Sequence, residues 1–275
     1  MQFRWLGVAG IELRSSGQAL VIDPYFTRIP LRRMLEHMQP DGRLIADQIP
    51  RCDFILVTHP HYDHLLDVPE AVRNTGAMVL GSANACRLLT ALGVPAKRVR
   101  QVSAGDSLAL GDFRVEVLPG KHGKIPLAGL LNRRLPARLR PPLRAWDYRM
   151  DRCFSFLIHA AGCRMLVGLG EYPDEAPAAD VLCVGVINSP GCYRSLLQRA
   201  RPQVVVPIHW DDFFRPLSKP LRPMLTPPAW AIPPLRRVSL AGFKRMIKQM
   251  SPGTRVITPE IFRLYNCGEI LSDTE

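Results

Sequence analysis
The stretch Thr58-His59-Pro60-His61-Tyr62-Asp63-His64 constrains the fold and the chemistry of this chain more than any other. It places three imidazoles and one carboxylate directly after an apolar run at residues 54–57. An apolar run bounded by polar residues predicts a buried β-strand. Imidazole nitrogens and carboxylate oxygens are the ligands that divalent transition metals bind in proteins. The sequence therefore predicts a metal site at the end of this strand, rather than a loop that merely happens to be rich in histidine.

Apolar runs and turn signals predict that strands and helices alternate along the chain. Predicted strands occupy residues 3–8, 11–14, 19–22, 54–57, 77–80, 99–102, 108–110, 113–118, 154–159, 164–167, 180–185 and 203–208. Predicted helices occupy residues 31–38, 67–74, 82–92, 192–200 and 239–250. This alternation in two similar halves indicates an α/β fold with two sheets, and a chain of 275 residues suits one domain, residues 1–275.

Three more predicted strands are followed by ligand-type side chains. His122 comes just after the strand at 113–118, Glu171 lies in an acidic loop after the next hairpin, and His209 directly follows the valine-rich strand at 203–208. Five of the seven histidines lie at strand ends, which scattered surface histidines would not do. His159 lies inside a predicted strand, away from any motif, and is interpreted as structural.

The net charge of +12 is concentrated in two segments. A basic insertion at 121–150 is part of a stretch, 121–152, with nine Lys or Arg against two Asp, and a Pro-rich basic segment at 215–250 has eight basic residues and no acidic one. Such blocks favour an anionic partner: a phosphate-bearing substrate, a membrane surface or nucleic acid. The alternative is a solvated basic face that keeps the protein in solution. Seven prolines between 216 and 234 exclude one regular element there, and Trp230 and Leu235 are candidates to cover a pocket or contact a membrane.

The composition excludes several classes of protein. Hydrophobic residues make up 47% of the chain, which is typical of a globular protein, and no apolar run is long enough to predict a transmembrane helix. The N-terminus begins in strand-like sequence and lacks the layout of a signal peptide. Seven cysteines, none of them in a Cys-x-x-Cys pair, favour reduced thiols in the cytoplasm over a disulfide framework.

The order of these motifs resembles the metallo-β-lactamase superfamily. The resemblance rests on His59-x-His61-x-Asp63-His64, the later histidines and the acidic loop, with Trp5-Leu6-Gly7, Asp23-Pro24 and Pro207-Ile208-His209-Trp210 resembling the broad metal-dependent hydrolase branch. That branch includes sugar-phosphate lactonases and N-acylphosphatidylethanolamine phospholipase D-like enzymes. The match extends over about residues 1–214, and the histidine motif is specific for the superfamily but not for a substrate. The resemblance implies a four-layer αββα sandwich with a dinuclear metal site at one edge.

The resemblance also implies a role for each ligand candidate. His59, His61 and His122 would hold one metal, and Asp63, His64 and His209 the second. In the family an Asp in the acidic loop bridges the two metals, whereas here Gly170 is followed by Glu171. Glu171 would then take its place with a shifted geometry, or Asp174 would, or the second metal site would be weak. A further departure is Val8, where several relatives have a histidine.

The implied chemistry is hydrolysis by a metal-bound hydroxide, with Asp63 as a ligand or as the catalytic group that orients the water and accepts its proton. The two divalent metal ions would be zinc, with manganese or iron as alternatives. The basic segments favour an anionic small-molecule or lipid substrate, cleaved at a phosphodiester, with peripheral contact to an anionic membrane. The alternatives are a lactonase or another carboxyl-ester or amide hydrolase, a nuclease, and a non-catalytic metal-binding protein. The absence of a recognisable nucleic-acid module disfavours the nuclease.

Overall fold

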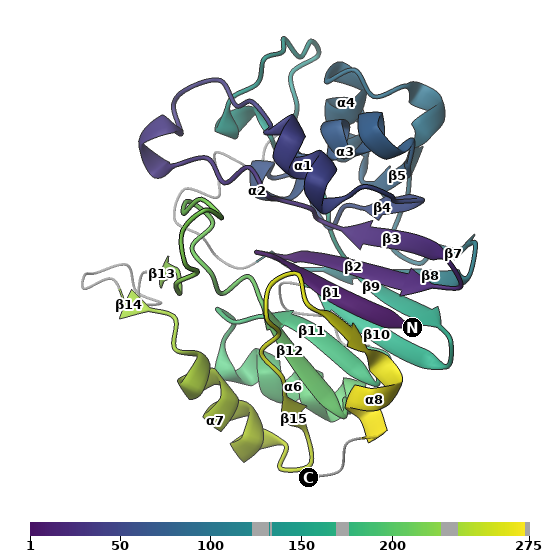
Figure 1. The fold of residues 1–275 in the computed structure, drawn as a ribbon, viewed down its shortest axis with the longest axis vertical. Helices are drawn as coiled ribbons and strands as arrows, with labels where there is room; N and C mark the ends of the chain where they lie inside the picture. The colour runs from purple at the N-terminus through teal and green to yellow at the C-terminus, as the bar shows by residue number, and fades with distance from the viewer. Residues whose placement is uncertain (123–131, 133, 169–175, 227–235, 273–275) are drawn as a thin grey trace.

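The computed structural model describes residues 1–122, 132, 134–168, 176–226 and 236–272. Two seven-stranded sheets face each other in it (Figure 1). The first sheet has the order β16-β1-β2-β3-β4-β5-β6 and the second has the order β15-β12-β11-β10-β9-β8-β7. The strands of the first sheet are β1 (Gln2–Gly7), β2 (Gly10–Ser15), β3 (Gln18–Ile22), β4 (Phe54–Leu56), β5 (Met78–Gly81), β6 (Val99–Gln101) and β16 (Leu264–Asn266). Those of the second are β7 (Ser107–Leu110), β8 (Phe113–Gly120), β9 (Cys153–Ala160), β10 (Cys163–Gly168), β11 (Val181–Gly185), β12 (Val204–Ile208) and β15 (Arg255–Val256).

Helices cover the outer face of each sheet (Figure 1). The first sheet carries α1 (Gly42–Gln48), α2 (Tyr62–Leu65), α3 (Val68–Thr75) and α4 (Ala83–Ala91). The second carries α6 (Pro190–Ala200) and α7 (Leu240–Met250), and α8 (Cys267–Ser272) follows β16. Single turns of 3-10 helix occur at η1 (Leu31–Arg33), η2 (Ala96–Arg98) and η3 (Ala145–Asp147), and a small hairpin pairs β13 (Leu225–Thr226) with β14 (Arg236–Arg237). Every helix in the described residues is too short or too polar to cross a lipid bilayer.

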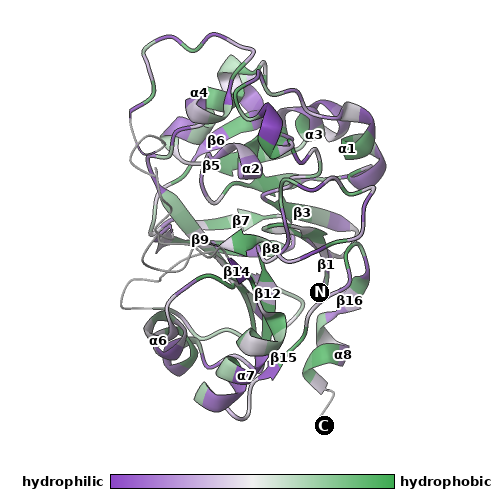
Figure 2. Cartoon of the chain, turned by 90° about the vertical axis from the view of Figure 1, so that its left-hand side faces the viewer, coloured by the Kyte–Doolittle hydropathy of each residue, from purple (hydrophilic) through white to green (hydrophobic). Residues whose placement is uncertain are grey.

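Three separate hydrophobic cores hold these four layers together. Alternate side chains of a strand point to opposite faces of its sheet, as Leu20 and Val21 of β3 show: Leu20 joins the core between the sheets, and Val21 joins the core beneath α1 to α4. The third core lies between the second sheet and α6 and α7, with Phe243 and Ile247 buried against it. Figure 2 shows strands coloured mainly as hydrophobic and outer helices with both polar and apolar residues. The predicted α/β four-layer αββα sandwich is confirmed.

Local sequence signals explain where the helices start. Ser82, Ser189 and Ser239 accept hydrogen bonds from backbone N–H groups of the first turns of α4, α6 and α7, which satisfies donors that a helix start leaves unpaired. Asp41 does the same for α1 by accepting from Leu44 N at 3.0 Å.

The predicted helix at residues 31–38 is wrong. Only Leu31–Arg33 forms a 3-10 turn there, and the regular helix begins later, at Gly42, behind the Asp41 cap. None of the η1 residues is buried, so no apolar face holds a longer helix in place. The short edge strands β15 and β16 and helix α8 were not predicted.

The sheets meet at the edge where β4 and β12 end. Phe154 N, in β9 of the second sheet, donates to Thr58 O at 2.8 Å, just after β4 of the first. His209 N, after β12, donates to Val8 O at 2.7 Å, just after β1. The residues that directly follow these strands therefore lie at one edge of the two sheets, on the left of Figure 1.

Candidate metal centre
The histidine motif leaves β4 and turns at once into the short helix α2. Pro60 separates His59 from His61, and His61 is the residue that precedes the first turn of α2. Asp63 and His64 lie within that turn. The side chains of His59, His61, Asp63 and His64 are all buried, so the motif faces inward rather than toward solvent.

The first group of ligand atoms combines His59 and His61 with His122, which follows β8. Their rings form a nearly equilateral triangle, with centroids 4.6 Å apart for His59 and His61, 4.7 Å for His59 and His122, and 4.8 Å for His61 and His122. One ring nitrogen from each lies within 4.8 Å of the other two. Three converging imidazoles suit a divalent transition metal.

The second group combines Asp63 and His64 of α2 with His209, which follows β12. Asp63 Oδ2 lies 3.4 Å from His64 Nε2 and 3.3 Å from His209 Nε2. The ring of His64 is also 4.0 Å from that of His59, centroid to centroid, so the two groups adjoin each other. Two ligand sets side by side, one of three histidines and one of two histidines and an aspartate, match the arrangement of a two-metal site.

Asp23, at the end of β3, holds both groups in orientation. Its Oδ2 lies 2.7 Å from His64 Nδ1 and also accepts the hydroxyl of Thr58, while its Oδ1 accepts from Thr58 N at 2.8 Å. The Thr58 hydroxyl in turn lies 3.0 Å from His59 Nδ1. A carboxylate that binds one ring nitrogen fixes the tautomer and leaves the other nitrogen directed at the site. Asp23 is fully buried, as this role requires.

The charges of the site differ between the two groups. Burial, followed by the neighbouring histidines, holds the pKa of His59 well below its usual range, and burial lowers the pKa of His61 to about 3. Burial opposes protonation of His64 too, yet Asp63 and Asp23 outweigh it and raise the pKa of His64 to about 10. Burial likewise opposes ionisation of Asp63, but His64 and His209 hold the pKa of that carboxyl well below its usual range. His59 and His61 are therefore neutral, whereas the second group contains a carboxylate.

Unpaired nitrogens show that the residues fit a metal. His59 Nε2, His61 Nε2 and His209 Nδ1 are buried and have no hydrogen-bond partner among the described residues. A buried polar atom without a partner is costly, and a bound metal ion would supply the partner that these nitrogens lack. Neutral imidazole is the form that binds metal. His59, His61 and His122 would hold one ion, and Asp63, His64 and His209 the other.

A buried ion pair supports His209 from behind. Arg28 Nη2 donates to Asp211 Oδ2 at 2.5 Å, and the other oxygen of Asp211 accepts from Val8 N at 3.0 Å. Val8 O then accepts His209 N at 2.7 Å. Val8, Arg28 and His209 all adopt left-handed backbone conformations, with φ of 48°, 45° and 53°, which non-glycine residues avoid unless the surroundings impose them.

The basic insertion comes near the first group at Asn132, whose side chain partly opposes the lowering of the pKa of His61. The later part of the insertion is fixed to α4: Asp151 accepts from the Ser82 hydroxyl at 2.6 Å and from Asn84 N at 3.1 Å. Leu143 and Tyr148 are buried in the same core as Tyr62 of α2. The arginine-rich chain therefore packs on the layer that carries the metal ligands.

The structure brings together six of the seven predicted ligands: His59, His61, Asp63, His64, His122 and His209. Glu171, with Gly170 and Asp174, lies outside the described residues, as do Trp230 and Leu235, so these predictions stay predictions. His159 pairs across strands with Glu116 at 3.2 Å, away from the centre. The roles of Asp23, Arg28 and Asp211 were not predicted. Asp23 was named only within the Asp23-Pro24 motif at the end of a predicted strand, and no role was assigned to it.

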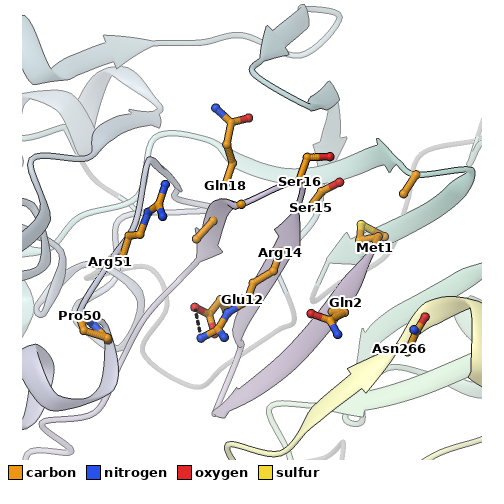
Figure 3. Close-up of a pocket in the computed structure, with 13 residues that line it drawn as sticks. Met1, Gln2, Glu12, Arg14, Ser15, Ser16, Gln18, Pro50, Arg51 and Asn266 are labelled. Carbon is orange, nitrogen blue, oxygen red and sulfur yellow. Dashed lines mark hydrogen bonds and ion pairs between the residues drawn. The ribbon is translucent and has the colours of Figure 1, made fainter.

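A hollow of about 620 Å³ lies at the opposite edge of the first sheet (Figure 3). It is lined by the β2–β3 turn and by residues around the starts of β1 and β4, which are the ends away from the metal centre. Its buried carboxylate, Glu12, is paired with Arg4 at 2.6 Å and with Arg14 at 3.1 Å. None of the predicted ligands lines this hollow.

Comparison with known proteins agrees with this geometry. A family model described as "Beta-lactamase superfamily domain" matches residues 18–164, which is more than half of the chain. The chain is 26% identical over 219 residues to a "UPF0173 metal-dependent hydrolase" of Pyrobaculum arsenaticum, covering 78% of this chain and 85% of that protein. It is 27% identical over 232 residues to a protein of the same name from Symbiobacterium thermophilum, with the same coverage.

Solved structures share the fold at low sequence identity. Igni18, described as a novel metallo hydrolase from Ignicoccus hospitalis, aligns with a TM-score of 0.60 at 17% identity over 96% of both chains. YhfI of Bacillus subtilis, described as a metallo-beta-lactamase fold protein, aligns with a TM-score of 0.58 at 11% identity, over 96% of this chain and 99% of that one.

Proposed function
Because the chain belongs to the metallo-β-lactamase superfamily and is a metal-dependent hydrolase of that superfamily, we propose that it cleaves a phosphodiester in an anionic substrate, either a phosphate-bearing small molecule or a lipid. The metal ions we propose are zinc, with manganese or iron as alternatives, because the first ligand group consists of three imidazoles and the second of two imidazoles and one carboxylate. We propose the cytoplasm as the location, since seven cysteines without a Cys-x-x-Cys pair suit a reducing compartment.

One observation carries the choice of an anionic substrate: the basic insertion packs on the layer that holds the metal ligands, with Leu143 and Tyr148 buried in the same core as Tyr62 of α2. The two acidic residues near the end of the insertion are already engaged, Asp147 with Arg144 N at 2.8 Å and Asp151 with α4. The side chains of Arg134, Arg138 and Arg140 are exposed. The positive charge of these arginines is therefore available to a substrate, and arginine binds phosphate oxygens in a bidentate manner.

The residues of the metal centre and of the insertion would have different roles in hydrolysis. A divalent metal, when bound, lowers the pKa of water toward neutrality and polarises a phosphoryl oxygen. Asp63 Oδ2 faces both His64 and His209 and is ionised, so it can orient a water molecule and accept its proton. Asp23 and Thr58 keep the rings of His64 and His59 in place. The insertion arginines would bind the phosphate that remains charged through the reaction.

A substrate panel tests the proposal. The purified protein, loaded with Zn²⁺ or Mn²⁺, is assayed on bis(p-nitrophenyl) phosphate, on a lactone and on a phospholipid. We expect turnover of a phosphodiester and none of the lactone, and we expect His61→Ala to abolish that turnover because it removes a ligand of the first group. Turnover of the lactone alone would instead make the protein a carboxyl-ester hydrolase whose basic residues are only surface charge.

Charge variants test the role of the insertion. Arg138→Ala/Arg140→Ala should raise KM for the phosphodiester about tenfold with kcat nearly unchanged, since these side chains would bind the substrate charge in both ground and transition states. Arg73→Ala/Arg114→Ala removes the same charge from exposed positions on α3 and β8 and serves as the matched control. Equal effects of both pairs would show that the insertion does not recognise the substrate.

A further inference from the structure
The turn after β3 exposes two leucines next to two arginines. Leu31 is 66% exposed and Leu35 is 74% exposed, and they are two of the five large hydrophobic residues that the described chain leaves exposed. Arg32 and Arg33 lie between them and are exposed as well. Residues 31–35 are called the tip below. A single exposed leucine needs no explanation, but two on one basic projection form a surface with a specific chemistry.

The tip is held firmly at its base. The side chain of Asp67 accepts from Phe26 N at 2.5 Å and from Thr27 N at 3.0 Å, and the Tyr25 hydroxyl accepts from Ile29 N at 2.8 Å. On the far side of the tip, Met38 N donates to Leu143 O at 2.8 Å. Successive turns close the tip itself, with Arg33 N bound to Pro30 O at 2.8 Å and Glu36 N to Arg33 O at 3.0 Å. The leucines are therefore presented on an ordered projection.

The charge around the tip is positive. Its nearest acid in the chain, Glu36, is paired with Arg33 at 2.7 Å, which leaves the charge of Arg32 uncompensated by it. An isolated antiparallel β-bridge between the backbones of His37 and Arg144 joins the end of this segment to the basic insertion, where Arg138 and Arg140 are exposed. Exposed leucines flanked by arginines match the interface of an anionic bilayer, where apolar side chains enter the headgroup region and basic ones bind phosphates.

The size and charge of the tip disfavour a protein partner. A stable protein interface buries about 800 Å² on each side, which two leucines do not supply. A second copy of this chain would also bring another net charge of +12 against the first. A lipid surface requires neither a large complementary area nor a folded partner, because the side chains insert one by one.

The tip lies at the same edge of the molecule as the metal centre. The segment that carries it leaves β3 at Asp23, which binds His64, and passes through Arg28, which binds Asp211 behind His209. In Figure 1 this segment is the purple projection at the upper left, beyond α2. A surface that the tip contacts would therefore face the side on which the metal ligands gather.

We propose that the protein docks on an anionic membrane through the tip, with Leu31 and Leu35 inserted between headgroups and with Arg32 and the insertion arginines on lipid phosphates. Docking would bring the metal centre to the membrane surface. The inference goes beyond the proposed function, because it concerns where the protein binds and does not depend on which bond it cleaves.

Co-sedimentation with vesicles tests this docking. Vesicles of phosphatidylcholine alone are compared with vesicles that also contain phosphatidylglycerol, at low and at high salt. We expect binding to the anionic vesicles only, weakened by salt, because electrostatic attraction to the surface is screened. Leu31→Ser/Leu35→Ser should weaken this binding about tenfold or more, since it removes the apolar insertion. Leu264→Ser, which changes an exposed leucine on β16, should leave it unchanged.

Two results would overturn the docking proposal: no binding of the wild type to anionic vesicles at low salt, or equal binding by the wild type and the double variant. If vesicle binding is absent and the double variant abolishes a self-association seen in sedimentation velocity, the tip is instead an interface between two copies of the chain. Circular dichroism and the rate on bis(p-nitrophenyl) phosphate check that the double variant is folded. Vesicle binding without turnover of any substrate in the panel would contradict the proposed function and leave the docking in place.

Discussion
At the scale of single residues, the protonation states of the ligand histidines determine how readily each group binds metal. His59 and His61 are neutral in the metal-free protein, because burial lowers their pKa values, and they need lose no proton on binding. His64 is different, since Asp63 and Asp23 keep its ring protonated up to about pH 10 despite its burial. Metal must therefore displace a proton at the second group, and acid should weaken binding there more than at the first.

The same proton stabilises the metal-free fold. The pKa of His64 is raised in the folded state to about 10 from its usual value. The protonated ring therefore contributes fully to the free energy of unfolding below about pH 6.5, and this contribution is lost as the pH rises through the folded pKa. We predict that, between pH 6.5 and 8.5, the stability of the chelator-treated protein falls by about 2 kcal/mol relative to that of a His64→Gln variant, which shares its cysteines and its other histidines. Urea denaturation at each pH measures this fall.

His64→Gln supplies the control for the pH dependence. Glutamine can still donate a hydrogen bond to Asp23 but carries no titrating proton, so His64→Gln keeps only the pH dependence of the other groups. A wild-type profile parallel to that of His64→Gln would show that the ring is neutral in the metal-free protein.

At the scale of elements, the ends of the strands depend on interactions that connect distant parts of the chain. Asp211, two residues beyond His209, binds Val8 N after β1 and Arg28 after β3. Arg28 is 1% exposed and Asp211 is fully buried, so neither charge has water as an alternative partner. This pair fixes the loop that carries His209 to the first sheet.

We predict that breaking this pair destabilises the protein and weakens the second metal group. Arg28→Met or Asp211→Asn leaves one buried charge alone and should cost about 3–5 kcal/mol, whereas the double variant should cost less than the sum of the two. Chelator competition should show weaker binding of one metal per chain and little change in the other, because Arg28 and Asp211 connect to His209 and not to His61.

The same measurement distinguishes a specific role at the second metal group from a general role in the stability of the fold. If the pair only held the fold together, both metals would weaken to the same extent, or neither would. Arg164→Met, which breaks the partly exposed pair between Arg164 and Asp180 at 2.7 Å, is the matched control and should leave both metals unaffected.

The elements also show how far the sequence predicts this protein. Strands such as β4, β8 and β12 were predicted because they are short apolar runs, and the ligands follow because they come directly after them. The helix predicted at residues 31–38 does not form because Leu31–Arg33 bury no side chain and make only a 3-10 turn, while the regular helix α1 begins behind the Asp41 cap. The roles of Asp23, Arg28 and Asp211 could not be assigned, since they arise from contacts between residues up to 203 positions apart.

At the scale of the whole molecule, the metal centre joins two halves that each have their own layer of helices. The first sheet supplies His59, His61, Asp63 and His64, and the second supplies His122 and His209. Trp5, at the end of β1, stacks on Trp210, after β12, with centroids 5.3 Å apart, so the halves are already in contact beside the centre. Each ligand group takes members from both halves, so each bound ion would connect the two sheets.

This arrangement predicts that metal stabilises the complete fold and does so through the second sheet. A ligand that binds only the folded state adds about 4 kcal/mol at a concentration 1,000-fold above its Kd. Thermal denaturation with and without chelator should show a higher Tm for the loaded wild type. His122→Ala and His209→Ala should each lose much of that increase while unfolding near the wild-type temperature without metal, since neither forms part of a hydrophobic core. His37→Ala, an exposed histidine outside both groups, should keep the full increase. If His122→Ala and His209→Ala kept it as well, the ligands on the first sheet would be sufficient to bind the metal, and the ions would not connect the two halves.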